Sequence, residues 1–368
     1  MNNPWKVWDW IIPLAGRTST LQNQSCGCNI IGIGGSYLSS MSRHLLNSGF
    51  SVGIFRFTLV PREVLFVPAV NKANMLRGAF GHAFRRLCCV PQCASARECP
   101  LAESCPYKII FEPSPPPDAD RLSRNQDIPR PFIFRAPASD KTKFQPGEEF
   151  EFGLVLIGRA IESLPYFVLA FREVAAQGIG LNRAKCELRE VKEALDSDAP
   201  GFAAQIYAAS DQVFRSPKGV DVERWMAGRL AAFPRPLGKT RIRFLSPTHI
   251  KSENQVVRSP DFHHVFKRLR DRINALSTFY GSGPLDADFA GLGARAAQVR
   301  TTSAHVRWEE RSRTSSKTHQ QHGLSGFVGE AVYEGDLDEF LPWLMMGELV
   351  HLGKHTAWGM GQIQAAKI

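Results

Sequence analysis

The feature that most constrains this chain is an element order that occurs twice. The first half opens with an apolar segment that ends at Leu59–Pro61, and the second half opens with Ile242–Pro247. A loop and a predicted helix follow each segment, over about 74–87 in the first half and about 260–276 in the second. Because 368 residues exceed the usual length of one domain, this order predicts a duplicated fold.

The later parts of the two halves also correspond. In each half a strand leads to a glycine, Gly158 or Gly335, and a Leu-Pro pair inside a helix begins six residues later. Each helix then runs into a glycine-rich loop and a last strand: Gly178–Gly180 before Cys186–Val191, and Gly353–Gly361 before Ile363–Ala366. The order strand, helix, strands, helix, strand predicts an α+β chain of two tandem ferredoxin-like, or RRM-like, domains.

Two of the predicted helices carry an apolar stripe, which a helix needs in order to pack on one face of a sheet. The stripe of the helix after Gly158 consists of Ile161, Leu164, Val168, Phe171 and Ala175. The stripe of the second helix consists of Phe262, Phe266, Leu269, Ile273 and Leu276. Ser259 is the predicted N-cap of this second helix, and Pro260 lies in its first turn.

The predicted domain boundaries follow from these segments. Residues 1–50 mix Trp, Ser, Gly and Asn without a helical or strand period, and we expect a poorly ordered N-terminal tail there. The first domain covers 51–196, the segment 197–238 connects, and the second domain covers 239–368. The first domain holds a Cys-rich insert at 88–106 and a Pro-rich loop at 113–137.

The charge balance limits the class of partner. Lys and Arg number 45 against 35 Asp and Glu, which gives a net charge of +10 and a pI near 9.3. This balance favours a polyanionic partner, either nucleic acid or an anionic membrane surface. No run approaches the roughly 18 apolar residues of a membrane span, and the start lacks the order of a signal peptide. We therefore predict a cytoplasmic protein.

The predicted insert gathers four cysteines within seventeen residues: Cys89, Cys93, Cys99 and Cys105. Closely spaced thiolates in a reducing cytoplasm suit a tetrahedral structural zinc ion, which would hold together an insert with little core of its own. Which of Cys88 and Cys89 is the ligand stays open. An iron–sulfur cluster is the second possibility, and free thiols without a metal are the third.

The predicted helix at 74–87 has a basic side. Its buried stripe is predicted to be Leu76, Phe80, Ala83 and Leu87, and its opposite side gathers Gly78, His82, Arg85 and Arg86. Arg77 is a further candidate for contact with a polyanion. Two glycines inside a helix cost about 1 kcal/mol each relative to alanine, so we expect something to approach this backbone closely. The alternative is a solvated basic face whose glycines pack on a neighbouring element.

The segment 351–368 gives the strongest functional signal. Its loop contains Gly353, Lys354, His355, Thr356, Trp358, Gly359 and Gly361. Backbone N–H groups and the lysine of such a loop can surround phosphates, and the tryptophan can stack on a base. The loop leads into a strand and lacks the GK[ST] ending of a nucleotide-binding P-loop. The alternative is a plain turn.

A loop of similar composition ends the first half. Its candidates for polyanion contact are Gly178, Gly180, Asn182 and Arg183, and Lys251 is a further candidate in the second half. Here too a plain turn is the alternative interpretation.

Four segments together resemble the CRISPR-associated processing endoribonucleases of the RAMP superfamily. They are LRGAFGHAFRRL, the cysteine insert ending CPLAESCPYKIIFEP, IGRAIESLPYFVLAFREVAAQGIGLNRAKCEL, and GFVGEAVYEGDLDEFLPWLMMGELVHLGKHTAWGMGQI. The resemblance extends from about residue 54 to the C-terminus. The final glycine-rich loop is specific for the superfamily, and the cysteine insert narrows the match to a subfamily.

The resemblance implies two RRM-like folds that face each other and bind the CRISPR repeat of a precursor RNA. It implies one cut per repeat, in which the 2′-hydroxyl of the RNA attacks the adjacent phosphate and leaves a 2′,3′-cyclic phosphate. Such a reaction needs a base, an acid and positive charge at the transition state. It needs no metal, so the expected zinc has no part in catalysis.

The resemblance also implies a histidine on or near the first helix, where His82 is the match. His351 and His355 are alternative catalytic residues, and His351 fits equally well as a core histidine with satisfied hydrogen bonds. Lys354 is the candidate for phosphate stabilisation. His319 and His322 fit a solvated or RNA-contacting loop.

Two other functions stay open at this point. One is a non-catalytic subunit of the same superfamily, which would hold guide RNA in a CRISPR effector complex. The other is a zinc-bearing protein unrelated to RNA whose basic charge is incidental. A competent histidine separates the endoribonuclease from the binding subunit, and salt-dependent RNA affinity separates both from the third possibility.

Overall fold

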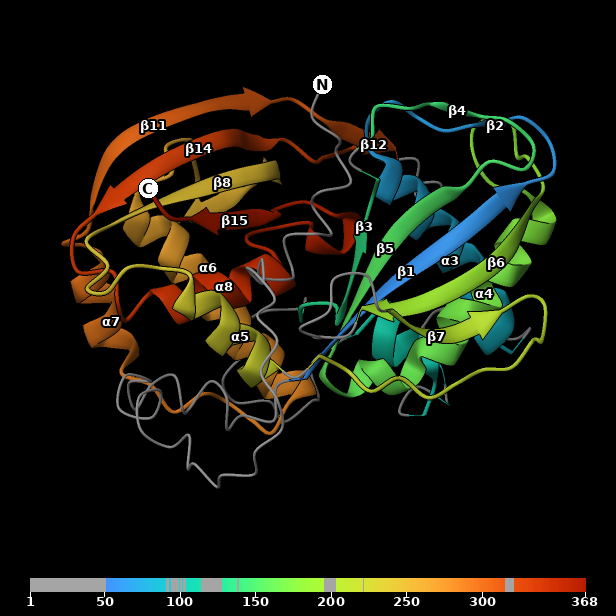
Figure 1. Ribbon diagram of the computed structural model, residues 1–368, viewed down its shortest axis with the longest axis horizontal. Coiled ribbons are helices and arrows are strands. Elements are labelled where there is room, and N and C mark those ends of the chain that lie inside the picture. Colours follow the sequence, from blue (N-terminus) through green and yellow to red (C-terminus); the bar gives the residue numbers. More distant parts are fainter. Residues whose placement is uncertain are drawn as a thin grey trace, which may run out of the picture.

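The computed structural model describes residues 51–90, 93, 99, 101, 104–113, 128–137, 139–194, 203–220, 222–314 and 321–368. The predicted tail at 1–50 and most of the Pro-rich loop at 113–137 lie outside these residues. Figure 1 shows two lobes side by side, the first half of the chain forming the one on the right and the second half the one on the left.

The first half is built on a five-stranded antiparallel sheet in the order β3-β5-β1-β6-β7. Its elements in chain order are β1 (Val52–Pro61), β2 (Leu65–Phe66), α3 (Lys72–Cys88), the short π-helical turn η1 (Tyr107–Phe111), β3 (Phe132–Arg135), β4 (Lys143–Phe144), β5 (Phe150–Ile157), the 3-10 turn η2 (Gly158–Ser163), α4 (Leu164–Gln177), β6 (Cys186–Ala194) and β7 (Ala203–Ala208). Helices α3 and α4 cover one face of this sheet (Figure 1).

The second half is built on a four-stranded antiparallel sheet in the order β11-β14-β8-β15. Its elements are α5 (Val222–Ala231), β8 (Lys239–Thr248), β9 (Ile250–Ser252), β10 (Gln255–Val257), α6 (Phe262–Tyr280), α7 (Phe289–Ala296), β11 (Arg300–Glu309), β12 (Ser312–Thr314), β13 (Gln321–Gly323), β14 (Gly326–Glu334), α8 (Leu341–Val350), the 3-10 turn η3 (Thr356–Trp358) and β15 (Ile363–Ala366). Helices α6 and α8 pack on one face of the sheet.

Both sheets have the ferredoxin-like strand order, and the predicted α+β class is confirmed. In each half the first core strand lies between the third and the fourth, and the second strand lies at the edge beside the third. The predicted Leu-Pro pairs begin helices α4 and α8, where proline lacks only an N–H that would have had no partner. Both predicted apolar stripes are buried.

Two details of the predicted helices are wrong. Asp261, with extended backbone, is the N-cap of α6, and Ser259 donates instead to its carboxylate at 3.2 Å. In α3 the residue Leu87 is 45% exposed, and Phe84 is buried instead, because α4 and η1 cover the side on which Phe84 lies. Phe80 of α3 stacks on Phe167 of α4 at 4.3 Å, which fixes the helix pair.

The glycines of α3 have different surroundings. A Cβ on Gly81 would overlap the ring of Phe111, so the close approach that the sequence predicts comes from the chain's own η1. A Cβ on Gly78 would meet nothing within 4 Å.

The segment between the predicted domains contributes to both halves. Its strand β7 pairs with β6 and extends the first sheet. Its helix α5 places Trp225, Met226 and Leu230 in the core of the second half. None of the helices in the described ranges is long and apolar enough to cross a membrane.

A buried polar network joins the halves. Arg135 at the end of β3 donates to the carbonyls of Glu348 and Leu349 at 2.7 and 3.1 Å, and to Nε2 of His351 at 3.2 Å. These acceptors lie at the C-terminal end of α8, where a cation is favourable because carbonyls there have no partner within the helix. Arg272 of α6 donates to a further carbonyl at this end, that of Val350, at 2.8 Å.

Candidate functional site

The glycine-rich loop of the second half, residues 353–361, lies at the joint and is called the terminal loop below. It folds back onto the end of β8: the N–H of Lys354 donates to the carbonyl of His249 at 3.0 Å, and that of Gly361 donates to the carbonyl of Pro247 at 3.0 Å. The loop also packs against β3 of the first half (Figure 1). It therefore joins the two halves at the place where β8 ends.

The glycines of the terminal loop are explained by close backbone packing. Gly353, Gly359 and Gly361 all have positive φ, and a Cβ on them would overlap the carbonyl oxygens of His249, Phe134 and Leu352, respectively. The N–H groups of Lys354, Trp358, Gly359 and Gly361 donate to carbonyls of the protein. Those N–H groups are therefore already used, and phosphate recognition here rests on side chains.

Two histidines meet beside the terminal loop. The ring centroids of His249 and His355 lie 6.1 Å apart, and His355 has a left-handed backbone with φ of 63°. Nδ1 of His249 lies 2.9 Å from the carbonyl oxygen of Ser325. Because a carbonyl can only accept, Nδ1 carries the proton of the neutral ring, and Nε2 is left as an acceptor.

Burial lowers the pKa of His249, a hydrogen bond to Ser325 opposes this, and the charges of Lys354 and Lys251 lower the pKa further. His249 is therefore neutral at pH 7. A neutral imidazole with one fixed tautomer and two lysines nearby can act as a general base on a negatively charged substrate. Lys251, a predicted polyanion contact, thus lies within range of this histidine.

An aromatic side chain flanks the histidine pair on the second sheet. Trp308 of β11 lies 6.0 Å from the ring of His249, and the guanidinium of Arg258 lies 4.6 Å from the centroid of Trp308. Such a half-buried indole beside a cation can support a stacked base.

Trp358 itself contacts arginines. The guanidinium of Arg77 lies 4.1 Å from the Trp358 ring centroid, that of Arg313 lies 4.8 Å away, and that of Arg130 lies 5.8 Å away. His355 lies 5.5 Å from the same ring in a T-shaped contact. The predicted base-stacking residue is therefore part of a cation–aromatic cluster next to the histidines. Thr356, another predicted contact, is buried at the start of η3.

His351 is a structural residue. Its side chain is fully buried, Nε2 accepts from Arg135, and Nδ1 lies 3.1 Å from the carbonyl of Met360. Burial and then the charge of Arg135 lower its pKa well below the usual range, so the ring is neutral. With both nitrogens bonded inside the protein, His351 corresponds to the core histidine that the sequence left open.

The structure does not bring His82 to the histidine pair. Ala73 and Arg77 of α3 contact the terminal loop. His82 follows Ala73 by nine residues, which at about 100° per residue places it on the opposite side of the helix, where it is exposed.

The two predicted arginines of α3 contact other elements. Arg86 forms a salt bridge to Glu173 of α4 at 2.7 Å and also donates to Gln177. Arg85 donates to the carbonyl of Cys93 at 3.3 Å. Of the arginines predicted on this helix, Arg77 is thus the one that reaches the joint.

The corresponding loop of the first half packs against β2. The N–H of Leu181 donates to the carbonyl of Phe66 at 2.8 Å, and the side chain of Asn182 bonds the backbone of Phe66 and Val64 at 3.1 and 2.7 Å. A Cβ on Gly178 or Gly180 would overlap a carbonyl, of Arg183 or Phe66 respectively. Here the plain-turn interpretation accounts for the loop, and Arg183 is its exposed residue with positive φ.

The cysteines of the insert interact with one another. Burial raises the pKa of Cys89 to about 11, and neighbouring Cys93 and Cys105 contribute. Burial also raises that of Cys93, which hydrogen-bonds with Cys99. All described cysteines are free thiols, and no group of three ligand side chains within the described ranges is arranged around a metal.

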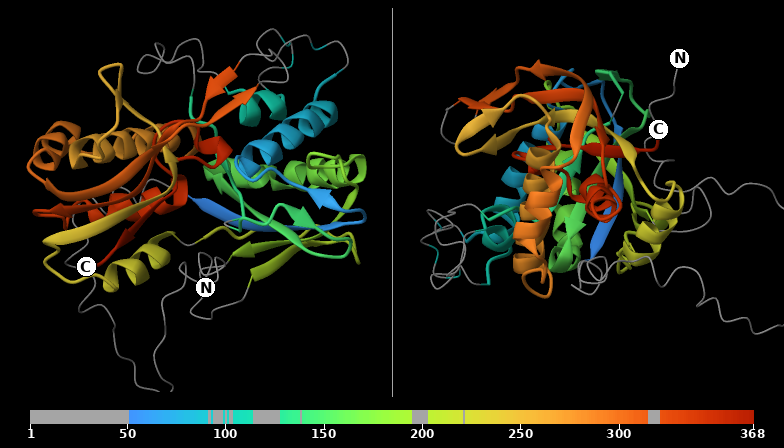
Figure 2. Two further views of the ribbon diagram at one scale, coloured as in Figure 1. Left: turned by 90° about the horizontal axis from the view of Figure 1, so that it is seen from above. Right: turned by 90° about the vertical axis from the view of Figure 1, so that its left-hand side faces the viewer.

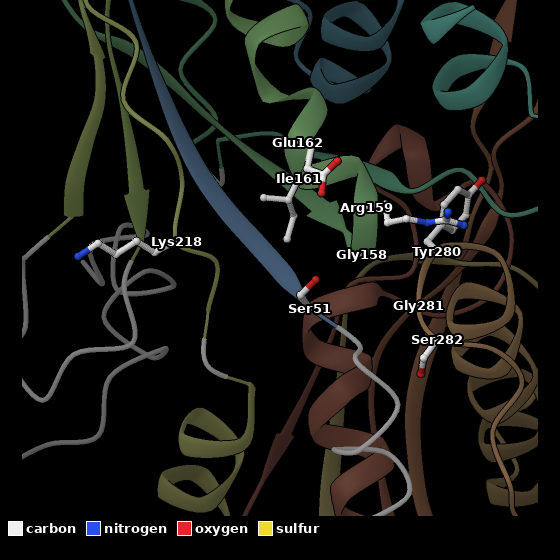
Figure 3. Close-up of a pocket in the computed structure, with 9 residues that line it drawn as sticks. All are labelled: Ser51, Gly158, Arg159, Ile161, Glu162, Lys218, Tyr280, Gly281 and Ser282. Carbon is white, nitrogen blue, oxygen red and sulfur yellow. The ribbon is translucent and has the colours of Figure 1, made fainter. Parts of the chain in front are cut away.

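A cavity of about 420 Å³ lies elsewhere along the joint (Figure 3). Its lining includes Ser51, Arg159, Glu162, Lys218 and Tyr280, and Lys218 points away from the other labelled side chains. The lining contains no histidine or cysteine. The histidine pair beside the terminal loop is therefore the candidate site. Of the two other predicted loop histidines, His319 lies outside the described residues, and only the backbone of His322 is described, in β13.

Sequence reasoning missed His249, Trp308, Arg130 and Arg313. The predicted topology itself held the signal for His249. In a ferredoxin-like sheet the fourth strand pairs with the first, so the loop before β15 must lie beside the residues that follow β8. That rule places residues 247–249 next to the terminal loop.

Comparisons with known proteins agree with this architecture. A family model described as CRISPR-associated endoribonuclease Cas6 matches residues 242–363, and a model described only as an N-terminal domain matches residues 50–219. A search of curated proteins finds no match.

Among solved structures, a Cas6 product complex is 17% identical, with a TM-score of 0.50, over 86% of this chain and 99% of that chain. A partial Cas6-RT-Cas1–Cas2 complex is 12% identical, with a TM-score of 0.52, over 88% of this chain and 47% of that one. Thermus thermophilus Cas6 is 16% identical, with a TM-score of 0.47, over 86% of this chain and 99% of its own.

The family match covers residues 242–363, which contain His249, His355 and the whole terminal loop, whereas the two solved structures with TM-scores of 0.50 and 0.52 share the fold of the chain. The subfamily with a four-cysteine insert stays a prediction. Residues 242–363 are thus similar to the CRISPR-associated endoribonuclease Cas6 family, and the chain has the fold of solved Cas6 structures.

Proposed function

We propose that this protein is a sequence-specific endoribonuclease that cuts the repeats of CRISPR precursor RNA to give guide RNAs. The single observation that carries the proposed site is the His249–His355 pair, 6.1 Å apart beside the terminal loop, with Lys354 and Lys251 close enough to lower the pKa of His249. A phosphodiester held between two such rings lies within hydrogen-bond reach of each.

In the proposed reaction, Nε2 of His249 takes the proton of the 2′-hydroxyl, whose oxygen then attacks the adjacent phosphorus. The bond from phosphorus to the 5′-oxygen breaks, and His355 gives that oxygen its proton. The products are a 2′,3′-cyclic phosphate and a 5′-hydroxyl. Lys354 and Lys251 stabilise the extra negative charge on the phosphorus oxygens in the transition state. Because a side chain supplies each proton transfer, the mechanism assigns no step to a metal ion.

The test is single-turnover cleavage of repeat RNA in EDTA by His249→Gln and His355→Gln variants. We expect each to lose cleavage by at least about 10²-fold while RNA affinity stays close to that of the wild type. His82→Gln is the matched control, because His82 is an exposed histidine on the far side of α3 and should leave the rate unchanged. Normal cleavage by His249→Gln would overturn the site. If His82→Gln alone is inactive, the assignment based on the first helix is right.

A non-catalytic RNA-binding subunit is the alternative function. It predicts tight, salt-dependent binding of repeat RNA by the wild type without any cleavage in EDTA. The described structure gives no observation that favours it over the endoribonuclease.

We also propose a structural zinc ion held by Cys89, Cys93, Cys99 and Cys105. The hydrogen bond between Cys93 and Cys99 and the mutual effects of Cys89, Cys93 and Cys105 support it, since they place these thiols near one another. Elemental analysis of protein purified without added metal should find about one zinc ion per chain, and Cys99→Ser should lose it. Iron and visible absorbance would instead support an iron–sulfur cluster. If the analysis finds neither zinc nor iron, the cysteines are free thiols.

The proposed setting is the cytoplasm of a prokaryotic cell, in antiviral defence. The proposed partners are precursor RNA and a CRISPR effector complex. Support comes from the family match and the basic charge. Co-purification from native cells, with and without RNase treatment, would show whether a complex forms through protein contacts.

A further inference from the structure

Three arginines from separate segments meet around the indole of Trp358. Arg77 comes from α3 and Arg130 from the residues before β3, so the first half supplies two. Arg313 comes from β12 of the second half. Asn71, at the start of α3, donates to the carbonyl of Ser312 at 3.2 Å and so holds β12 next to the helix. Figure 2 shows the β12–β13 hairpin reaching across to α3.

The cluster contains buried donors without acceptors. Nε of Arg77, Nε of Arg313 and Nε1 of Trp358 are buried and have no hydrogen-bond partner among the residues that the structure describes. Such groups usually find a partner, because an unmade hydrogen bond in a buried place costs about 1–3 kcal/mol. Three of them in one cluster indicate that the described residues leave these donors open to an acceptor on a ligand.

The charges of the cluster point the same way. Burial lowers the pKa of Arg77 to about 9, and the like charges of Arg130 and Arg313 contribute after it. Burial and Arg130 also lower the pKa of Arg313. Among the described residues none of these three side chains forms a salt bridge.

Among the described residues, the carboxylate of Glu112 lies within range of the cluster. Glu112 favours the charged form of Arg77, but its carboxylate accepts from the hydroxyl of Tyr107 at 3.2 Å. Within the described part of the chain, this one carboxylate against three guanidinium groups leaves a net positive site. Arg130 and Arg313 are only half-buried, so a ligand can reach it from solvent.

We propose that Arg77, Arg130 and Arg313 form a phosphate-binding site that holds a backbone phosphate of the RNA beside the nucleotide at the histidine pair. Guanidinium groups present N–H donors in a planar fork that matches phosphate oxygens, and several cations from different segments can surround one tetrahedral anion. The contact between Trp358 and His355 at 5.5 Å makes the two sites neighbours. Because both halves supply arginines, bound phosphate also fixes the halves against each other.

This inference rests on the proposed RNA substrate but is tested without cleavage. Inorganic phosphate is the probe, and the readout is the unfolding temperature in phosphate compared with chloride at equal ionic strength and pH. A ligand that binds only the native state raises this temperature. We expect this temperature to rise for the wild type, and most of the rise to be lost in Arg313→Gln, which removes a half-buried arginine that contacts Trp358.

Arg307→Gln is the matched control, since Arg307 is an exposed arginine of β11 paired with Glu309. It should keep the full phosphate effect. In chloride, Arg313→Gln should unfold no earlier than the wild type, because it removes a like charge from beside Arg77. A purely structural arginine would instead lower the unfolding temperature in both salts. No phosphate effect in the wild type, or an unchanged effect in Arg313→Gln, would overturn the site.

The RNA itself gives a second readout. Binding of a repeat RNA with 2′-O-methyl groups throughout, which blocks cleavage, is measured against salt concentration. Loss of one phosphate contact in Arg313→Gln should reduce the slope of log affinity against log salt by about 0.7, whereas Arg307→Gln should leave the slope unchanged. If the phosphate effect is present but no RNA is cut, the proposed reaction fails and this site stands. If RNA is cut normally and phosphate has no effect, the reverse holds.

Discussion

The two halves carry a glycine-rich loop at the same place in the fold, but among the described residues only the loop of the second half lies beside a histidine pair. Each loop follows the helix that begins with Leu-Pro, α4 or α8, and precedes the last core strand of its half, β6 or β15. In the first half the loop packs against β2, and the side chain of Asn182 forms hydrogen bonds with the backbone of Val64 and Phe66. In the second half it lies at the joint, with His355 and Lys354 beside His249.

This difference shows that the glycines serve the packing of the loop backbone in both halves and are not by themselves a sign of function. Gly180 and Gly361 have positive φ, and each lies against a carbonyl of the preceding structure. Function depends instead on which surface the loop meets. The terminal loop meets arginines of the other half and a second histidine at the end of β8, whereas the loop of the first half meets only β2 and its neighbouring backbone.

The largest expected effect is on the cleavage rate when the basic residue of each loop, Lys354 or Arg183, is removed. Lys354→Ala should lower single-turnover cleavage by about 10²–10³-fold, because it removes a charge beside the reacting phosphate. The matched change in the first half, Arg183→Ala, should leave the rate unchanged. Equal losses from both variants would show that both loops contact the cut site and would break the comparison.

A pH profile of the cleavage rate sharpens the role of His249. The base must be neutral, and burial lowers its pKa from the usual value near 6.5. The rate at saturating enzyme should therefore rise about tenfold per pH unit at acidic pH and level off below pH 6.5. A rise that continues well above pH 7 would contradict His249 as the base.

Alanine at matched glycines tests the packing argument. Gly361→Ala and Gly180→Ala should each destabilise the fold by about 1–3 kcal/mol, because both positions need a left-handed backbone. Denaturant unfolding measures this. Only Gly361→Ala should also slow cleavage per folded molecule, since it displaces His355 and Lys354. A Gly180→Ala variant with normal stability would show that the first loop is not packed as described.

The residue after each helix gives a further contrast, Gly178 after α4 and His351 after α8. His351 has a lowered pKa in the folded protein, so the unfolded chain binds the proton more readily. Its contribution to stability is therefore complete above pH 6.5 and is lost as the pH falls below that value, by at most about 1.4 kcal/mol per unit. The free energy of unfolding of the wild type and of His351→Gln, measured between pH 7.5 and about 5, gives this contribution of His351. Parallel dependence on pH in the two proteins would refute it.

The smallest expected effect is that of Asn182→Ala. Loss of its hydrogen bonds to the backbone of Phe66 and Val64 should lower the free energy of unfolding by about 1 kcal/mol. Cleavage and RNA affinity should not change. Reduced RNA affinity would restore the first loop as a binding element.

Much of the fold could be predicted from the sequence, since the repeat of Leu-Pro helices and glycine-rich loops fixed the ferredoxin-like order. Periodicity identified the buried stripes of α4 and α6 because each packs on one broad face. Periodicity wrongly predicted that Leu87 is buried, because α4 and η1 determine which side of the C-terminal end of α3 is covered.

The site was harder to predict. Lys354 and His355 stood out because glycines flank them, but Arg130 and Arg313 lie in segments without a pattern of their own. Their convergence on Trp358 depends on how one half docks against the other, which local sequence does not encode. His82 was favoured by resemblance alone, and the helix turns it away from the terminal loop.

The buried guanidinium of Arg135 has a consequence for how the chain matures. Its acceptors, the ring of His351 and the carbonyls of Glu348 and Leu349, lie more than 200 positions later. During synthesis the first half therefore leaves the ribosome with a cation whose acceptors have not yet been made. Premature termination near residue 345 should thus damage β3 as well as the missing end, and neither lobe should be obtainable as a stable fragment.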